Sequence, residues 1–157
     1  VLTLTNVTGF AATVESEKNM ASAVAKLTYV FANATVPKVN VIVGKAFGSA
    51  YVSMNSKSIG ADLVYAWPTA SVGMMPAENA VKIIYNDEIN ASDDAQGLIA
   101  EKAAAYAALQ TSPESAAGRG YVDAVIEPES TRQHLIAAFE MLYSKRAVRP
   151  SKKHSTL

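Results

Sequence analysis

The stretch PKVNVIVGKAFGSAYVSMNSKSIGADLVYAWP, residues 37–68, determines the predicted fold of this chain. It begins with an apolar, β-branched run at 39–43, between a proline and Gly44, and a run of this kind predicts a buried strand. Small residues at 48–50 and at Ser53 predict a loop that leads directly into a short helix. A turn at 60–62 and a second short strand at 63–66 complete the stretch.

The residues before this stretch predict a strand and a helix. The strand is expected from residue 1 to 5 or 7, and the helix at 17–33 with Ser16 as its N-cap. Apolar residues recur along that helix at spacings of three and four and therefore share one face: Met20, Val24, Leu27 and Phe31. A strand, a helix and a strand within about forty residues predict a right-handed crossover between two parallel strands.

The residues after the stretch predict further helices and one more strand. We expect helices at 77–85 and 92–109, a break at 111–113, a strand at 121–126 and a last helix that ends near 144. In the first of these helices, Ala80, Val81 and Ile84 should face the core. The last helix has capping-box spacing at 130–133 and an apolar stripe: Leu135, Ile136, Phe139, Leu142 and Tyr143.

The composition is typical of one folded domain. The chain has 157 residues, of which 50% are hydrophobic and 18% charged, and this balance is unlike that of a disordered chain. Basic and acidic residues number 14 each, so no net charge favours nucleic acid or a membrane surface. The absence of cysteine excludes disulfides and thiolate metal sites and fits a reducing cytoplasm. No apolar run approaches the ~20 residues of a membrane span.

The turn at Gly48-Ser49-Ala50 is the best candidate site in the residues themselves. The first backbone N–H groups of a helix have no partner within it, so a helix that starts here could bind an anion. A tight turn without any ligand explains the same residues, because small residues are ordinary in turns. The residues alone leave both interpretations open.

Three segments of the chain resemble one family. They are KAFGSAYVSMNSKSIGADLVYAWPTA at 45–70, RGYVDAVIEP at 119–128 with Thr131 and Arg132 after it, and the basic run Lys152-Lys153-His154. Together they resemble the C-terminal half of the carboxyltransferase subunit of biotin-dependent acyl-CoA carboxylases and decarboxylases, of the propionyl-CoA, methylmalonyl-CoA and glutaconyl-CoA type. The resemblance implies an α/β, crotonase-like fold of ββα units, incomplete at its N-terminus. It also implies carboxyl transfer between carboxybiotin and an acyl-CoA.

The resemblance assigns roles at the turn. In the family, backbone amides there form an oxyanion hole for the ureido oxygen of biotin. Carried over to this sequence, the donors are the N–H groups of Ser49 and Ala50, and the cofactor-binding residues are Phe47, Gly48, Ser49, Ala50 and Tyr51. Glycine is usual at the position of Ser49, so a positive φ at this serine would strain the turn. Many members have aspartate at the position of Val52, so the valine implies either a changed acyl preference or ordinary helix packing.

The resemblance also implies partners and an organisation. Biotin would arrive on a biotin carboxyl carrier protein, acyl-CoA would be the substrate, and this chain would bind no metal. The second oxyanion hole, for the thioester, belongs in the family to the N-terminal half of a neighbouring subunit, so this chain alone should be inactive. We expect a cytoplasmic homo-oligomer that binds no nucleic acid, with a membrane partner only if the enzyme is a decarboxylase. The carboxyltransferase domain is expected at 1–148, truncated at its start, and a basic flexible tail at 149–157.

Two other functions stay open. A free-standing crotonase-type hydratase or isomerase acting on acyl-CoA would need a positioned carboxylate base near the turn, and the sequence offers no convincing one. A non-catalytic assembly domain would only pack into an oligomer. His134 and His154 lack neighbours at metal-ligand spacing, and we expect Tyr65 and Trp67 in the core.

Overall fold

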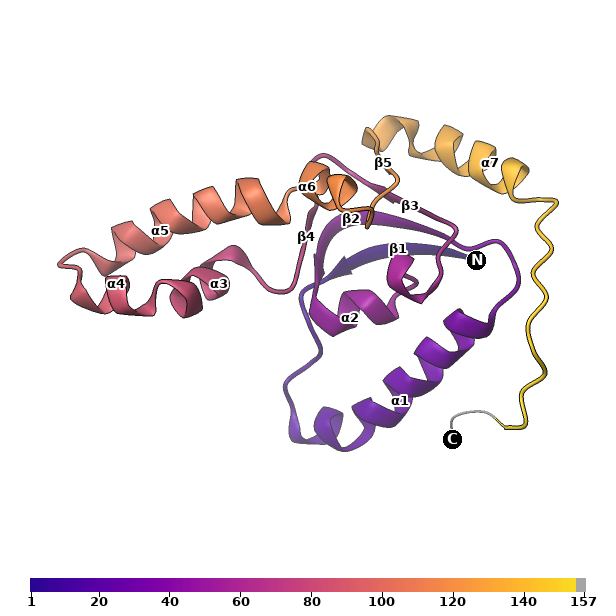
Figure 1. Cartoon of the computed structure of the whole chain (residues 1–157), viewed down its shortest axis with the longest axis horizontal. Coiled ribbons are helices and arrows are strands. Elements are labelled where there is room, and N and C mark those ends of the chain that lie inside the picture. Colours follow the sequence, from indigo (N-terminus) through magenta and orange to yellow (C-terminus); the bar gives the residue numbers. More distant parts are fainter. Residues whose placement is uncertain (155–157) are drawn as a thin grey trace.

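Figure 1 shows the computed structural model of the chain, which describes residues 1–154. The strands are β1 (Leu2–Val7), β2 (Val39–Phe47), β3 (Leu63–Ala66), β4 (Ser71–Gly73) and β5 (Ala124–Val125). The α-helices are α1 (Val14–Asn33), α2 (Gly48–Ser53), α3 (Ala77–Ile84), α4 (Asn86–Ala91), α5 (Ala95–Tyr106), α6 (Pro113–Gly118) and α7 (Thr131–Met141). Short 3-10 helices lie at Lys57–Ile59 and Pro128–Ser130, and a π-helical turn lies at Ala107–Thr111.

The strands form one parallel sheet. Its order is β1-β2-β3-β5, and β4 pairs with the C-terminal end of β2. Each of these pairings is parallel. Helix α1 connects β1 to its parallel neighbour β2, so the predicted crossover between two parallel strands is confirmed. All-parallel sheets are normally covered on both faces, and this sheet has helices on each side.

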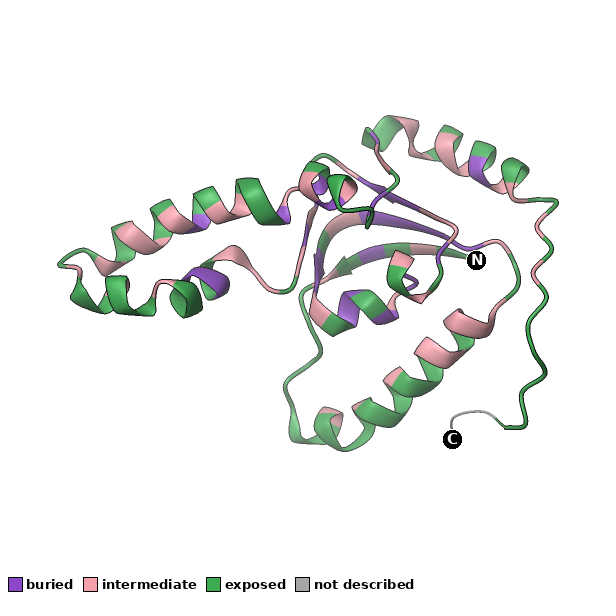
Figure 2. Cartoon of the chain, in the orientation of Figure 1, coloured by how far each residue is buried: buried purple, intermediate pink, exposed green. Residues whose placement is uncertain are grey.

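The core consists of two clusters, one on each face of the sheet. The cluster beside α2 contains Ile42, Val64 and Tyr51, and the cluster beneath α7 contains Val41 and Tyr65. Neighbouring residues of β2 and β3 alternate between the clusters, as side chains of a strand must. Residues 39–42 of β2 are fully buried, and Figure 2 shows the same burial along the central strands.

Strand β2 is longer than predicted and passes into α2 without a loop. We expected it to end before Gly44, but it continues to Phe47. Asn6 of β1 lies against this glycine: a Cβ at position 44 would be 2.6 Å from its Oδ1, and the same oxygen accepts the N–H of Lys45 at 2.9 Å. The β1–β2 register shifts between Thr5 and Val7. Gly44 therefore makes room for a neighbouring side chain rather than ending the strand.

The predicted start of α1 is wrong, whereas that of α7 is right but lacks its predicted hydrogen bonds. Helix α1 begins at Val14 because the hydroxyl of Thr13, not that of Ser16, is the cap and accepts the N–H of Ser16 at 3.1 Å. The capping box expected at the start of α7 does not form. The hydroxyl of Ser130 donates instead to the carbonyl of Glu127. In both cases a local hydrogen bond replaces the predicted one, because several neighbouring side chains can compete for the same partners.

Helices α3, α4 and α5 pack against one another and project from the rest of the chain as an arm (Figure 1). The sequence predicts α3 and α5 but not α4, and it also misses α6 after the break at 111–113. Ala80 and Val81 are buried as expected, whereas Ile84 is exposed, which makes that part of the prediction wrong. Short helices of six residues leave little periodicity to detect.

The end of the chain runs back past α1. The strand predicted at 121–126 is reduced to Ala124–Val125, and α7 ends at Met141 rather than near 144. Beyond α7 the chain is extended and approaches α1, where the hydroxyl of Tyr29 donates to the carbonyl of His154 at 3.5 Å (Figure 1). Residues 155–157 of the predicted basic tail lie outside the described residues. Up to residue 154, none of the helices is long and apolar enough to cross a membrane.

Candidate functional site

The turn from β2 into α2 depends on Gly48. This glycine has φ +62°, in the left-handed region, and a Cβ on it would lie 3.1 Å from the carbonyl oxygen of Met74. Because of both features, any residue with a Cβ would destabilise the turn at this position. Asn55 is the one non-glycine residue among 1–154 with a positive φ, so Ser49 does not carry the strain that a positive φ would bring. A serine can therefore stand here and still present its amide.

The amides of Ser49 and Ala50 are the second and third of α2. The first N–H groups of a helix cannot reach a carbonyl four residues back within it. Within the described chain, no hydrogen bond joins these two amides to a loop or to another element. Ser49 is exposed and Ala50 is buried. Two N–H donors at the turn thus have no partner in another described element.

A cavity of roughly 340 Å³ lies beside this turn. Three of the predicted site residues line it, Gly48, Tyr51 and Val52, whereas Phe47, Ser49 and Ala50 do not. The other lining residues come from β4, from the segment 106–111, from α6 and from the loops: Ser58, Val72, Gly73, Met74, Tyr106, Gln110, Thr111, Ala116, Arg119 and Tyr121. No aspartate or glutamate is among these lining residues, so this wall lacks the carboxylate base that a hydratase or isomerase would need.

Tyr51 places a neutral phenol at this cavity. Its ring packs in the core and its hydroxyl has no hydrogen-bond partner among the described residues. Burial, with a smaller contribution from Tyr121, raises the pKa of Tyr51 to about 12. The phenol therefore remains protonated at neutral pH and leaves an unsatisfied polar group next to the turn.

Arg119 and Gln110 form a polar rim that sequence reasoning missed. The guanidinium of Arg119 donates to the side-chain oxygen of Gln110 and, at 3.4 Å, to its backbone carbonyl. Gln110 lies on the π-helical turn, a geometry often found at functional sites. Arg119 belongs to a segment that carries the family resemblance, but nothing in the sequence pairs it with Gln110.

Other residues of the resembling segments hold the fold together. Asp123 accepts the N–H of Val64 at 2.7 Å and forms an ion pair with Lys57 at 2.7 Å. The indole N–H of Trp67 donates to the hydroxyl of Thr131 at 2.9 Å. These bonds join β3 to the strand and helix that follow much later in the chain. These hydrogen bonds and the ion pair explain the presence of these side chains without a bound ligand.

Asp62 makes a similar connection at the start of β2. One of its oxygens accepts the N–H of Lys38 at 2.7 Å and the ammonium of Lys145 at 2.8 Å. The buried ammonium of Lys38 donates to the carbonyl of Phe31 near the end of α1. Burial, followed by repulsion from Lys145, lowers the pKa of Lys38. The cluster ties α1 and the segment after α7 to the sheet.

Further charged and aromatic side chains also make contacts within the fold. Asp94 caps α5 by accepting the N–H of Gly97, and Glu88 pairs with Lys102. Tyr65 is buried and meets the ring of His134 edge-on, whereas Trp67 is only half-buried. Up to residue 154, no group of three or more His, Cys, Asp or Glu side chains is arranged to hold a metal ion.

The sequence matches the carboxyl transferase domain family over residues 1–157. It is 48% identical over its whole length to a putative propionyl-CoA carboxylase beta chain of Bacillus subtilis, and covers 31% of that protein. It is 45% identical over 83% of its length to the methylmalonyl-CoA carboxyltransferase 12S subunit of Propionibacterium freudenreichii, and covers 25% of it. The chain therefore spans about a third or less of the length of these relatives.

Solved structures agree in fold. A transcarboxylase 12S crystal structure, described as a hexamer assembly with methylmalonyl-coenzyme A and methylmalonic acid bound, superposes with a TM-score of 0.93 at 42% identity, over 98% of this chain and 30% of that one. The beta subunit of geranyl-CoA carboxylase from P. aeruginosa superposes with a TM-score of 0.77 at 24% identity, over 99% of this chain and 30% of that one, and is evidence for the fold alone. The α/β, crotonase-like fold that the resemblance implies is confirmed by these neighbours. With a family match over its full length and close relatives among acyl-CoA carboxyltransferases, this chain belongs to the carboxyl transferase domain family.

Proposed function

We propose that this chain is the biotin-facing part of an acyl-CoA carboxyltransferase, which moves a carboxyl group between carboxybiotin and an acyl-CoA. The observation that carries the proposal is the turn at Gly48, where two amides without an internal partner stand beside a cavity. The N–H groups of Ser49 and Ala50 donate to the ureido oxygen of biotin. Donors fixed in advance stabilise negative charge strongly because they need no reorganisation during the reaction.

The residues at the turn match biotin in their hydrogen-bonding chemistry. A ureido oxygen is a hydrogen-bond acceptor, and the two amides are donors that the rest of the described chain leaves free. The cavity wall formed by Val52, Val72 and Met74 is apolar and suits uncharged ligand atoms. When bound, carboxybiotin supplies the carboxyl group that is transferred. The chain binds the ureido oxygen, orients the biotin ring and excludes water from it.

Val52 is proposed as a determinant of acyl choice. It lies on α2, lines the cavity and is 37% exposed, so it is not merely a buried packing residue. An aspartate here should change the ratio of kcat/KM values between acyl-CoAs of different polarity while leaving the amides of the turn in place. A substrate series with acetyl-, propionyl- and longer acyl-CoAs would measure this. An unchanged ratio would show that Val52 only packs against its neighbours.

The partners proposed for the chain follow from this role. Biotin arrives on a biotin carboxyl carrier protein, and the N-terminal half of a neighbouring subunit supplies the donors for the thioester, so the chain alone does not transfer a carboxyl group. Residues 1–148 form the carboxyltransferase part and residues from 149 a basic tail. The working enzyme is a homo-oligomer of the cytoplasm, with a membrane partner if it acts as a decarboxylase.

The test replaces the amide of Ser49. In a full-length subunit containing this chain, Ser49→Pro should lower kcat by about 10²–10³, because proline has no N–H to donate. Ser49→Ala is the matched control: it keeps the amide, changes an exposed side chain and should retain nearly full turnover. The first turn of a helix tolerates proline, and circular dichroism would verify that the variant is folded. A folded Ser49→Pro enzyme with normal kcat would exclude the amide role.

A further inference from the structure

Among the described residues that line the cavity beside Gly48, only Arg119 carries a charge. The other lining residues are apolar or neutral. Within residues 1–154 Arg119 takes part in no ion pair, because the ion pairs there join other side chains. The cavity therefore has a positive charge at its rim that no carboxylate of the described chain neutralises.

The fold positions the guanidinium of Arg119 through Gln110. Arg119 follows α6 directly, and its two Nη atoms donate to the side-chain and backbone oxygens of Gln110 on the π-helical turn. The hydroxyl of Ser115 on α6 donates to the carbonyl of Leu109 at 2.8 Å and ties α6 to the same turn. The Nε–H of Arg119 forms no hydrogen bond within residues 1–154, and each Nη carries a second N–H. One side of the guanidinium is thus held by the fold, and the other side can bind a ligand.

The polar groups at this cavity favour a ligand that accepts hydrogen bonds and carries negative charge. A guanidinium and backbone amides can only donate hydrogen bonds. Arg119 and Gln110 are both exposed, so a ligand can reach them from solvent. A carboxylate only accepts hydrogen bonds, and its two oxygens match the planar fork of an arginine in a bidentate pair. The lining therefore indicates a carboxylate as the group that Arg119 would bind.

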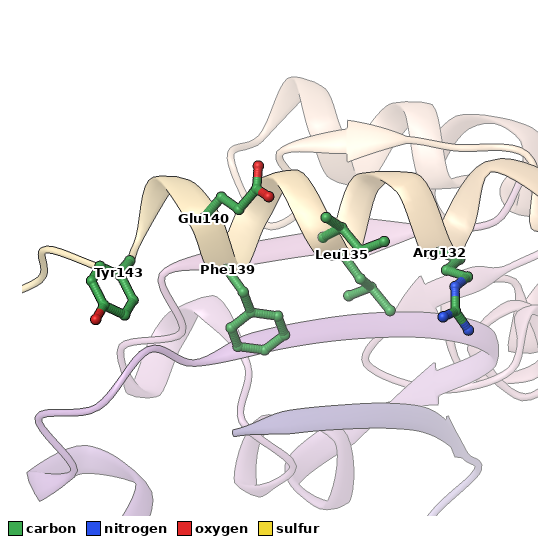
Figure 3. Close-up of a pocket in the computed structure, with 6 residues that line it drawn as sticks. Arg132, Leu135, Phe139, Glu140 and Tyr143 are labelled. Atoms are coloured by element: carbon green, nitrogen blue, oxygen red, sulfur yellow. The ribbon is translucent and has the colours of Figure 1, made fainter.

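A second cavity, along α7, also contains an arginine but has no such excess of positive charge. Its volume is roughly 640 Å³, and both Arg132 and Glu140 line it (Figure 3). Its other lining residues, among them Leu135 and Phe139, are apolar or aromatic. A carboxylate that entered this cavity would meet the carboxylate of Glu140 as well as the guanidinium. Of the two cavities, the one at Arg119 is therefore the better site for an anion.

We propose that Arg119 binds the transferred carboxyl group as a carboxylate, while the amides of Ser49 and Ala50 bind the ureido oxygen. The inference rests on the proposed function and adds to it a side chain that recognises the charge of the substrate. One cavity of roughly 340 Å³ is lined by both Gly48 and Arg119, so the two binding positions share one space. Gln110 is a positioning residue, because it acts through the guanidinium. Two substrates bring a carboxylate to this cavity, carboxybiotin and the carboxylated acyl-CoA, and Arg119 would bind either by the same chemistry.

Arg119→Gln in a full-length subunit that contains this chain tests the assignment. Because the arginine binds the carboxylate of the bound substrate, its loss should raise KM at least 10-fold and change kcat less. One assay measures KM for the carboxybiotin carrier at saturating propionyl-CoA. The reverse assay measures KM for methylmalonyl-CoA at saturating biotinylated carrier. A rise in the first assay only identifies carboxybiotin as the ligand of Arg119, a rise in the second only identifies the acyl-CoA carboxylate, and a rise in both shows that each binds there.

Three further variants separate charge, geometry and position. Arg119→Lys keeps the charge but not the planar fork, so it should raise the same KM less than Arg119→Gln, and it serves as a second variant should glutamine disturb the fold. Gln110→Ala removes only the partner of the guanidinium and should raise that KM by a smaller factor. Arg146→Gln is the matched control, because this exposed arginine lines neither cavity and loses the same charge, and its KM values should equal those of the parent.

The uncarboxylated substrate distinguishes carboxylate binding from a structural role. KM for propionyl-CoA should stay at the value of the parent in Arg119→Gln, since this substrate has no carboxylate. A folded Arg119→Gln enzyme with unchanged KM values for both carboxylated substrates would overturn the inference, and so would an equal rise for propionyl-CoA. The proposed function fails by a different result, a normal kcat in Ser49→Pro, so the two failures can be told apart.

Discussion

The two halves of the stretch 37–68 use their polar groups in opposite ways. At the turn, the amides of Ser49 and Ala50 and the hydroxyl of Tyr51 have no partner among the described residues and lie at or beside a cavity. In the second half, Lys57 and Trp67 are each bonded to side chains far along the chain. Polar groups left unpaired at a cavity can form hydrogen bonds to a ligand. Groups that are already hydrogen-bonded within the protein stabilise the fold instead.

The residues that carry the family resemblance therefore fall into two groups, one that stabilises the fold and one that lies at the cavity. The segments 45–70 and 119–128 both carry the resemblance, but their residues contribute differently to the molecule. Lys57, Asp62, Trp67 and Asp123 fix how α7 and β5 meet the sheet. The turn at Gly48 has unpaired polar groups, and it is the part to which we assign the proposed biotin site. The side chains of Lys57, Trp67 and Asp123 are already hydrogen-bonded within the fold, whereas the hydroxyl of Tyr51 is not.

Among the substitutions that compare the two halves, the largest effect should come from Gly48→Ala at the turn. Gly48→Ala forces a side chain into a position with φ +62° and a contact of 3.1 Å with the Met74 carbonyl. We expect kcat of a full-length subunit to fall on the order of 10²-fold, because both donors move. The free energy of unfolding should fall by ~1–2 kcal/mol. Enzyme kinetics and urea titration measure the two quantities.

Gly118→Ala is the control for that change. A Cβ at position 118 meets nothing within 4 Å, and the residue ends α6 without a positive φ. Alanine here should leave kcat unchanged and stabilise the chain slightly, by at most ~1 kcal/mol. Equal losses in both glycine variants would mean that the turn has no special role.

A smaller effect, on stability rather than turnover, is expected from the second half. Asp123→Ala removes the acceptor of the Val64 N–H and the partner of Lys57. Leaving a buried amide without a partner costs ~1–3 kcal/mol, so the urea midpoint should fall while kcat of the folded enzyme stays near that of the parent. Asp93→Ala, an exposed carboxylate on the arm side, should change stability by less than ~0.5 kcal/mol. A selective loss of kcat in Asp123→Ala would move Asp123 into the site.

The smallest effect at neutral pH should come from Tyr51→Phe. The hydroxyl has no partner among residues 1–154, so its removal should cost less than the ~1 kcal/mol of a typical hydrogen bond. The pH dependence is more informative, because burial raises the pKa of Tyr51 from 10.0 to about 12. The unfolded chain loses this proton first. The stability that Tyr51 provides is therefore complete below pH 10 and is lost as pH rises through about 12.

Urea unfolding of the parent and of Tyr51→Phe across this pH range measures the difference. We expect the stability gap between the two proteins to change in favour of the phenylalanine variant as pH rises above 10. A gap that stays constant would mean that Tyr51 ionises equally in the folded and unfolded chains. A large loss at neutral pH would instead show that the hydroxyl has a partner in solution.

Local patterns in the sequence determined the central elements. The β-branched run at 39–43 and the small residues after it led to β2, α2 and β3, and the strand–helix–strand order led to the parallel β1–β2 pair. These strands and helices follow from the periodicity and steric preferences of neighbouring residues, which can be read directly from the sequence. The resemblance of residues 45–70 to carboxyltransferases identified the family and pointed to the turn.

Tertiary structure alone decided how the polar residues are shared between fold and site. Asn6 binds the N–H of Lys45 and lets β2 continue past Gly44, Asp123 accepts the N–H of Val64, and Arg119 donates to Gln110 on the π-helical turn. Each of these outcomes depends on which of several hydrogen-bond partners is nearest in space, including partners from distant parts of the chain. The sequence shows which groups can form hydrogen bonds, but only the folded chain shows which remain unpaired at the cavity, because pairing depends on distances of about 3 Å between atoms.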